Sequence, residues 1–325
     1  MASMGLCCGN SDSRVPSTRL AGGWGLGQCR LREAARLAAM SLLLDEIAVA
    51  TARLAEAGVE SPRTDAELIA AHVHGVARGA LPTVPDASFD PRFWDEIARR
   101  EAREPLQHIT GHAYFRYLDL EVGPGVFVPR QETEVMTGWA IDQLREMDVA
   151  EPLVADLGTG SAAIALAISQ EVPRARVHAV EADPLARRWA ARNIARCAAS
   201  APHTAGRVIL HSGDFHGPLA GLDDAADLVI SNPPYIPAGA WVPPEVGEYD
   251  PASALWGGAD GLDAIRAIEA AAGRLLRARG LVAVEHGAQQ GSAVYWTFAE
   301  QRGWRETRNH KDLAGLDRFV TAVRE

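Results

Sequence analysis

The stretch Asp227-Leu-Val-Ile-Ser-Asn-Pro-Pro-Tyr-Ile236 decides the fold, because an apolar run ends in it at two consecutive prolines. Residues 227–230 predict a buried parallel strand. Pro233 and Pro234 cannot donate backbone hydrogen bonds, so the strand cannot continue through them. Open α/β sheets bind ligands at the carboxyl ends of their strands, and we therefore expect a binding site at this corner.

The corner presents two acceptors and one aromatic ring. The acceptors are the side-chain amide of Asn232 and the carbonyl of Pro233, and the ring belongs to Tyr235. Two acceptors can fix both hydrogens of a planar NH2 group, while the ring holds its plane. A turn that merely ends a strand is the alternative reading of Asn-Pro-Pro alone. The tyrosine and a cofactor loop upstream favour a site for an amine or amide.

The composition excludes several classes of protein. The 325 residues are 47% hydrophobic and 23% charged, as in a soluble globular protein of one large or two ordinary domains. No apolar run could span a bilayer, and the net charge of −10 argues against a protein that grips nucleic acid by a basic surface. Three of four cysteines lie within residues 1–40, so we predict no disulfide framework and no metal site. We expect a cytoplasmic monomer.

The first third of the chain divides into three segments. Residues 1–40 are rich in arginine and poor in acids, and we expect a disordered extension; a transit peptide and a start near Met40 are the alternatives. Residues 41–105 carry apolar positions at helical spacing and predict a small helical domain. Residues 106–131 predict a linking β-hairpin, in which 117–122 pairs with 126–128.

Residues 132–325 alternate strand and helix patterns, which predicts an α/β domain with a mostly parallel sheet. The expected strands are 153–156, 177–181, 208–210, 227–231, 281–285 and a closing pair near 304–310 and 317–323. The expected helices are 132–147, 161–171, 184–198, 261–278 and 289–301.

A glycine turn follows the first of these strands. It reads Asp156-Leu-Gly-Thr-Gly-Ser-Ala162, and its two glycines allow a tight turn and close backbone approach to a ligand. The anionic strand end would repel a dinucleotide's diphosphate but suits the sulfonium and amino groups of S-adenosylmethionine. A nicotinamide cofactor is the alternative. The candidate cofactor residues of the turn are Asp156, Gly158, Thr159, Gly160, Ser161 and Ala162.

Acidic residues also end or follow the next two strands. Glu181 lies about 20 residues after the turn, where a carboxylate can accept both hydroxyls of a ribose. Asp214 could accept from an adenine amino group, and Phe215 could cover the adenine face. Each acid alone could be a helix cap or a solvated strand end. Three acids at successive strand ends predict a cofactor crevice.

With these motifs in place, the chain from about Ser41 onward resembles the release-factor glutamine methyltransferases (PrmC/HemK), which are class I S-adenosylmethionine-dependent enzymes. The resemblance implies a Rossmann-like sheet. Ala162 stands where the family usually has glycine, and Gln131 where it usually has proline. The segments that carry the resemblance are Pro105–Gly111, Phe115, Pro129–Glu134, Asp156–Ala162, Asn232–Tyr235, Glu248–Leu255, Gly257–Leu262, Glu285–Gly287 with Gln289, and Asp312 with Gly315 and Arg318.

The resemblance implies methyl transfer to the amide nitrogen of the glutamine in the Gly-Gly-Gln loop of class I peptide chain release factors. Asn232, Pro233 and Tyr235 would be catalytic, with Asn232 also near the cofactor. Pro234 and Phe115 would complete the substrate pocket, and the helical domain would recognise the substrate.

Three other functions stay open at this point. They are N6-methylation of adenine in nucleic acid, methylation of a ribosomal-protein glutamine, and a cofactor-binding adaptor without turnover. The adenine reading predicts a basic, aromatic recognition segment, which the helical domain lacks. Intact Asp156, Glu181 and Asn232 argue against the adaptor.

Overall fold

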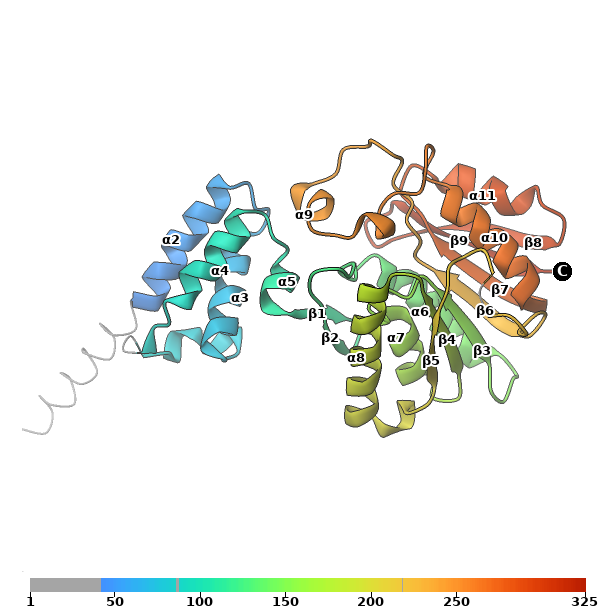
Figure 1. Ribbon diagram of the computed structural model, residues 1–325, viewed down its shortest axis with the longest axis horizontal. Coiled ribbons are helices and arrows are strands. Elements are labelled where there is room, and N and C mark those ends of the chain that lie inside the picture. The colour runs from blue at the N-terminus through green and yellow to red at the C-terminus, as the bar shows by residue number, and fades with distance from the viewer. Residues whose placement is uncertain (1–41, 86–87, 218) are drawn as a thin grey trace, which may run out of the picture.

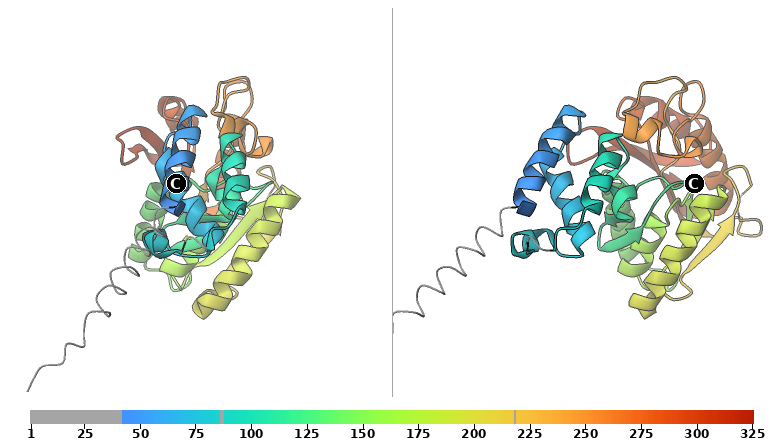
Figure 2. Two further views of the ribbon diagram at one scale, coloured as in Figure 1. Left: turned by 90° about the vertical axis from the view of Figure 1, so that its left-hand side faces the viewer. Right: turned by 60° about the vertical axis from the view of Figure 1, so that its left-hand side comes forward.

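The computed structural model describes residues 42–85, 88–217 and 219–325. The extension expected at 1–40 lies outside them. The described chain forms a helical domain and a larger α/β domain, with a two-stranded hairpin between them (Figure 1). The left view of Figure 2 looks along the molecule, so the helical bundle overlaps the α/β domain there, whereas Figure 1 shows the two side by side.

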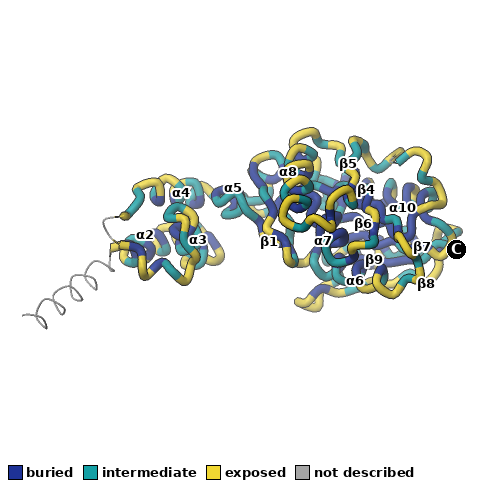
Figure 3. Tube along the Cα trace, turned by 90° about the horizontal axis from the view of Figure 1, so that it is seen from below, coloured by how far each residue is buried: buried dark blue, intermediate teal, exposed yellow. Residues whose placement is uncertain are grey.

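The helical domain consists of α2 (Leu42–Glu56), α3 (Pro62–His74), the 3-10 helix η1 (Arg78–Thr83) and α4 (Arg92–Glu101). Proline at the start of α3 and Gly75 at its end, with a φ of 62°, are the expected start and stop signals. The domain has a core of its own, visible as the separate buried interior in Figure 3. Its largest buried side chains are Ile47, Leu54, Ile69, Phe93 and Ile97.

The linker differs from its prediction. It contains a short helix, α5 (Leu106–Thr110), and its hairpin pairs β1 (His112–Phe115) with β2 (Leu118–Glu121). The expected pairing of 117–122 with 126–128 is therefore wrong. The chain turns at Arg116, whose φ of 52° is a left-handed conformation that a non-glycine residue seldom adopts.

The Gly123-Pro-Gly125 segment has a different role from the hairpin turn that its sequence predicts. It packs against α8 (Pro184–Ser200), where the indole of Trp189 donates a hydrogen bond to the Pro124 carbonyl at 3.2 Å. A Cβ on Gly123 would lie 2.7 Å from the Trp189 ring, so only glycine permits this approach.

The α/β domain is built on a seven-stranded sheet of order β5-β4-β3-β6-β7-β9-β8. Strands β3 to β7 run parallel, while β9 is antiparallel to both of its neighbours, so the predicted mostly parallel α/β fold is confirmed. The strands are β3 (Leu153–Leu157), β4 (Arg176–Glu181), β5 (Val208–Ser212), β6 (Ala226–Ser231), β7 (Leu276–Glu285), β8 (Trp304–Lys311) and β9 (Asp317–Arg324).

Helices cover both faces of this sheet because side chains alternate along its strands. Val154 faces the layer of α6 (Thr133–Glu146), α7 (Ala163–Glu171) and α8. Its neighbour Ala155 faces the layer of α10 (Asp263–Leu275) and α11 (Gly291–Ala299). Short helical turns complete the chain: η3 (Pro202–Thr204), α9 (Pro244–Gly247) and η4 (Ala252–Ala254).

One boundary lies well away from its prediction. Helix α10 ends at Leu275, and β7 already begins at Leu276, five residues before the expected strand. The pairing with β6 shifts in register between Ala226 and Leu228, and Arg279 has a φ of 66°. This bulge interrupts the alternation of apolar residues along the first half of β7, so the sequence pattern predicts only its second half.

Candidate active site

A cavity opens at the carboxyl ends of β3, β4, β5 and β6. The chain runs outward from β3 to β5 and then crosses to β6 on the other side of β3, so the cavity lies where the strand order reverses. Most of the predicted site residues line it. These are Phe115, Gly158, Thr159, Gly160, Ser161, Glu181, Asp214, Phe215, Asn232, Pro233, Pro234 and Tyr235.

Two predicted residues, Asp156 and Ala162, do not line the cavity but support its floor. Asp156 is fully buried, and its Oδ2 accepts a hydrogen bond from the Thr159 hydroxyl at 2.5 Å. Burial raises the pKa of Asp156 to about 7. The carboxyl group therefore fixes the turn from below, and its charge would act on a ligand without direct contact.

Ala162 is the residue that immediately precedes α7. It is fully buried and has a φ of 67° and a ψ of 25°, the left-handed conformation that favours glycine. The structure thus gives a backbone reason for the glycine expected at this position. The methyl group of Ala162 packs into the core and not into the cavity.

Glu181 ends β4 and is held by the backbone of the turn. Its Oε2 accepts from the Gly160 N–H and its Oε1 from the Asp183 N–H, both at 2.8 Å. Burial raises the pKa of Glu181, which the two backbone hydrogen bonds oppose. Each carboxylate oxygen keeps a second lone pair, so the residue can still accept from a diol.

The cavity fits a nucleoside with a positively charged substituent. A Cβ on Gly158 would lie 3.2 Å from the ring of Phe215, so glycine keeps the space beside this ring open. Asp214 lines the cavity next to that ring and Glu181 lines it at the neighbouring strand end. An aromatic face, two carboxyl groups and a glycine turn that allows close approach match the adenosine of S-adenosylmethionine.

The Asn-Pro-Pro-Tyr corner forms the opposite side of the cavity. The Ser231 hydroxyl donates to the Leu157 carbonyl at 2.5 Å, which ties the end of β6 to the end of β3. The Nδ2 of Asn232 donates to the Thr133 hydroxyl at 3.0 Å. Because its NH2 group is engaged, the side-chain oxygen of Asn232 is the atom left to accept from a ligand. Burial raises the pKa of Tyr235, which keeps its phenol neutral.

A loop folds back onto this corner and holds its backbone. A Cβ on Gly257 would lie 2.6 Å from the Pro234 carbonyl oxygen, and one on Gly261 would lie 2.2 Å from that of Tyr235. The Nε2 of Gln290 donates to the Tyr235 carbonyl at 2.9 Å. Gln289, the glutamine named in the resemblance, is exposed, and it is its neighbour Gln290 that makes this contact.

The same loop supplies a wall of the cavity through Pro251 and 253–255. It is anchored just before them by Asp250, whose Oδ2 lies 2.6 Å from the Arg130 guanidinium. Burial raises the pKa of Asp250 to about 6, although Arg130 lowers it. Both residues belong to the segments singled out in the sequence, but their pairing across 120 residues could not be read there.

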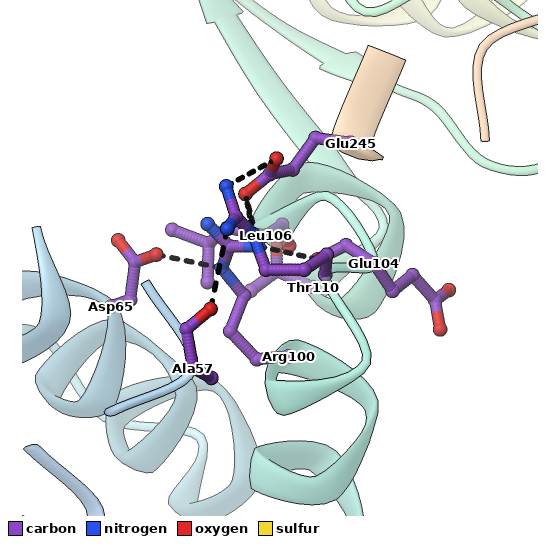
Figure 4. A network of polar contacts seen from close by, with 8 residues as sticks. Ala57, Asp65, Arg100, Glu104, Leu106, Thr110 and Glu245 are labelled. Carbon is purple, nitrogen blue, oxygen red and sulfur yellow. Dashed lines mark hydrogen bonds and ion pairs between the residues drawn. The ribbon is translucent and has the colours of Figure 1, made fainter. Parts of the chain in front are cut away.

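An ion-pair network joins this loop to the helical domain (Figure 4). Glu245 of α9 accepts from Arg103 at 2.5 and 2.7 Å and from Arg100 of α4 at 3.1 Å. Arg100, which is 7% exposed, also donates to Asp65 at 2.8 Å. The Tyr249 hydroxyl donates to the Ala102 carbonyl at 2.7 Å. The cavity wall and the helical domain are thus held together.

Two kinds of feature are missing from the part of the chain that the structure describes. Residues 42–85, 88–217 and 219–325 contain no cluster of three histidine, cysteine or acidic side chains that could hold a metal ion. No helix within these ranges combines the length and the apolar character that a membrane crossing requires.

Comparison with known proteins identifies both domains. Residues 47–111 match the PrmC N-terminal domain, and residues 118–243 match the methyltransferase small domain.

Relatives match over nearly their whole length. Release factor glutamine methyltransferase of Streptomyces coelicolor is 58% identical over 285 residues, which are 87% of this chain and 98% of the relative. The protein of the same name from Mycolicibacterium smegmatis is 47% identical over 289 residues, 88% of this chain and 99% of the relative. A 4-amino-L-phenylalanine/4-methylamino-L-phenylalanine methyltransferase of Streptomyces pristinaespiralis is 39% identical over 293 residues, 88% of this chain and 97% of the relative. The chain belongs to the release factor glutamine methyltransferase family.

Proposed function

We propose that this protein methylates the N5 amide nitrogen of the glutamine in the Gly-Gly-Gln motif of class I peptide chain release factors, with S-adenosylmethionine as the donor. The observation that carries the proposal is the Asn232 amide. It lines the same cavity as the glycine turn, and its NH2 group is already engaged by Thr133, so its oxygen is available for a substrate NH2.

The cofactor would be held by the turn Gly158–Ser161, by Glu181 at the ribose, and by Asp214 and Phe215 at the adenine. S-adenosylmethionine supplies an electrophilic methyl group on a positively charged sulfur. The buried Asp156 and the half-buried Glu181 place negative charge beneath and beside this site, which favours a cationic ligand over a diphosphate.

The chain's own residues act mainly by orientation. An amide nitrogen is a poor nucleophile because its lone pair is delocalised into the carbonyl. The Asn232 side-chain oxygen and the Pro233 carbonyl would each accept one hydrogen of the substrate NH2, and Tyr235 would stack on its plane. Because the NH2 group is already oriented when it is bound, the activation free energy no longer includes most of the entropy loss of a bimolecular encounter. The proton leaves after transfer, since no side chain of the corner acts as a general base.

The partner is a protein in this proposal. The helical domain and the loop tied to it by Glu245 would form the recognition surface, with the protein acting as a cytoplasmic monomer and without direct nucleic-acid binding. An aromatic amine, the substrate class in one relative's name, presents the same planar NH2 group to the same corner. It is therefore the control substrate that a test must include.

The test incubates the protein with labelled S-adenosylmethionine and a purified class I release factor. The controls are a Gln→Ala variant of the Gly-Gly-Gln loop, 4-amino-L-phenylalanine and duplex DNA, and mass spectrometry locates the label. We expect one methyl group on that glutamine and none on the variant. Label on the amino acid or the DNA at a higher kcat/KM would refute the proposal.

The role of the corner is tested by Asn232→Ala. We expect turnover to fall by at least about 100-fold, because both acceptor geometry and proximity are lost, while the cofactor Kd changes far less. Gln301→Ala is the control, since it removes an exposed side-chain amide outside the cavity. Normal turnover by Asn232→Ala would contradict the assignment.

A further inference from the structure

A buried polar chain lies behind Asn232, formed by residues that the reaction scheme does not use. Strands β6 and β7 are parallel, with Ser231 paired to Val284, so Asn232 and Glu285 follow at the same edge of the sheet. Thr133, the first residue of α6, accepts the 3.0 Å hydrogen bond from Asn232. The carboxyl group of Glu285 lies close enough to this hydroxyl for Thr133 to lower its pKa. The three side chains come from segments about 50 to 150 residues apart in sequence.

Glu285 is unusually placed for a purely structural acid. It is 1% exposed, and within the described ranges its Oε2 has no hydrogen-bond partner. The nearby cation, Arg318 of β9, donates to Asp312 at 3.0 and 3.1 Å. Glu285 is thus a buried acid without an ion-pair partner of its own, an arrangement that costs stability and suggests a function.

This buried polar chain determines which end of the Asn232 side-chain amide, the oxygen or the NH2 group, faces the cavity. A threonine hydroxyl has a single hydrogen, and a carboxylate can only accept. When Thr133 donates to Glu285, its oxygen can only accept from Asn232, so the NH2 end of that amide must point toward Thr133. The oxygen end then faces the cavity. Without the carboxylate, the hydroxyl could donate to Asn232 and the amide could turn over.

We propose that Glu285 and Thr133 are positioning residues for the methyl transfer, because together they hold the Asn232 amide with its oxygen toward the substrate NH2. This inference deepens the proposed function and rests on it for the identity of the substrate. Neither residue contacts the reacting atoms. Their effect is therefore on the orientation of Asn232, and it should be felt in kcat more than in cofactor binding.

The ionised form of Glu285 is the one that enforces this direction. Burial raises the pKa of Glu285 to about 7; Glu132 and Asp312 raise it further, whereas the Thr133 hydrogen bond and Arg318 lower it. The neighbouring phenol of Tyr235 stays neutral in this range because burial raises its pKa. At saturating cofactor, kcat should therefore rise as the pH increases through about 7. Saturation suppresses the contribution of Asp156, whose pKa is similar but which lies under the cofactor turn.

The test compares Thr133→Val, Thr133→Ser and Glu285→Gln with the wild type, measuring kcat, KM for the release factor, cofactor Kd and thermal stability. We expect kcat to fall by roughly 10-fold or more in Thr133→Val and Glu285→Gln, with cofactor Kd within about twofold. Thr133→Ser keeps the hydroxyl and should stay within about threefold. Glu285→Gln should also lose the rise of kcat near pH 7.

Thr137→Val is the matched control. Thr137 is fully buried one turn along α6, and its hydroxyl donates only to the Thr133 backbone carbonyl. This variant should lose comparable stability but keep its kcat within about twofold. A kcat loss in Thr137→Val equal to that in Thr133→Val would show that helix stability and not amide orientation matters, and would overturn the proposal.

A second readout does not depend on the substrate. Hydrogen exchange of the Asn232 side-chain NH2, followed by NMR, should be slow in the wild type and at least about 10-fold faster in Thr133→Val. Unchanged exchange together with unchanged kcat would overturn the positioning role. A wild type that fails to methylate release factors, yet shows this exchange difference, would refute the proposed substrate and leave the polar chain supported.

Discussion

Replacing Gly261 by alanine tests whether the loop that folds over the Asn-Pro-Pro-Tyr corner sets its geometry. Gly261 has a φ of 76°, and an alanine there costs about 1–2 kcal/mol from backbone strain alone. Its Cβ would also lie 2.2 Å from the Tyr235 carbonyl oxygen and 2.6 Å from the Gln290 Nε2. Normal contact requires a displacement of about 1 Å, and such overpacking costs about 1–3 kcal/mol more. The expected total loss is about 2–5 kcal/mol.

The control is Gly206→Ala, which has the same backbone problem without the collision. Gly206 has a φ of 73°, and a Cβ there meets nothing within 4 Å. Gly206→Ala should lose only the stability that corresponds to this backbone strain, about 1–2 kcal/mol. The difference between the two variants then isolates the contact with the corner.

Urea unfolding of both variants gives the stability loss, and single-turnover methyl transfer, measured where both are folded, gives the rate. We expect the rate of Gly261→Ala to fall at least about 10-fold, since a shift of about 1 Å at the corner misplaces the substrate NH2. Gly206→Ala should keep the wild-type rate. Equal stability losses and equal rates in the two variants would refute the idea that the glycine loop sets the corner.

Three further outcomes are expected. Glu245→Ala leaves Arg100 and Arg103 without their shared acceptor, so the free energy of unfolding should fall by roughly 1–3 kcal/mol. KM for the release factor should rise, while isothermal titration should show an unchanged cofactor Kd. Asp156→Asn should stabilise the ligand-free protein, and the gain in the free energy of unfolding should grow as the pH rises from 3.8 to about 7. The folded-state pKa of Asp156 is raised, so the wild type loses stability over this range as the acid ionises, whereas asparagine does not ionise. Urea unfolding measures the gain, and a gain independent of pH would contradict this. Ala162→Gly should change the free energy of unfolding by less than about 1 kcal/mol, since relief of the left-handed strain is offset by the lost buried methyl and the added flexibility of the unfolded chain.

Local pattern was sufficient for the regular part of the fold. The strand and helix periods of residues 132–325 predicted the sheet, because a buried parallel strand such as β6 reads as an apolar run of fixed length. The glycine turn and the proline corner were recognised for a related reason. Each concentrates its chemistry in a few consecutive residues whose backbone is restricted.

Features set by tertiary packing could not be read in this way. The turn of the hairpin lies at Arg116 and not at the glycines, because the Gly123-Pro-Gly125 segment packs against Trp189 instead. Thr133 and Glu285 lie in segments that carry the family resemblance, but the sequence assigned neither of them a role. Their meaning depends on a contact between segments about 150 residues apart, which no local period records.

The reversal of strand order between β3 and β6 has a consequence for how new specificities can arise in this scaffold. In the arrangement that we propose, the residues assigned to the methyl donor lie chiefly in 156–215, and those assigned to the acceptor nitrogen lie chiefly in 232–262. Donor recognition and acceptor recognition are therefore separately mutable modules that meet along one edge. Grafting a different acceptor segment onto an unchanged donor half should yield catalysts for other planar nitrogens, without any need to re-evolve affinity for the donor.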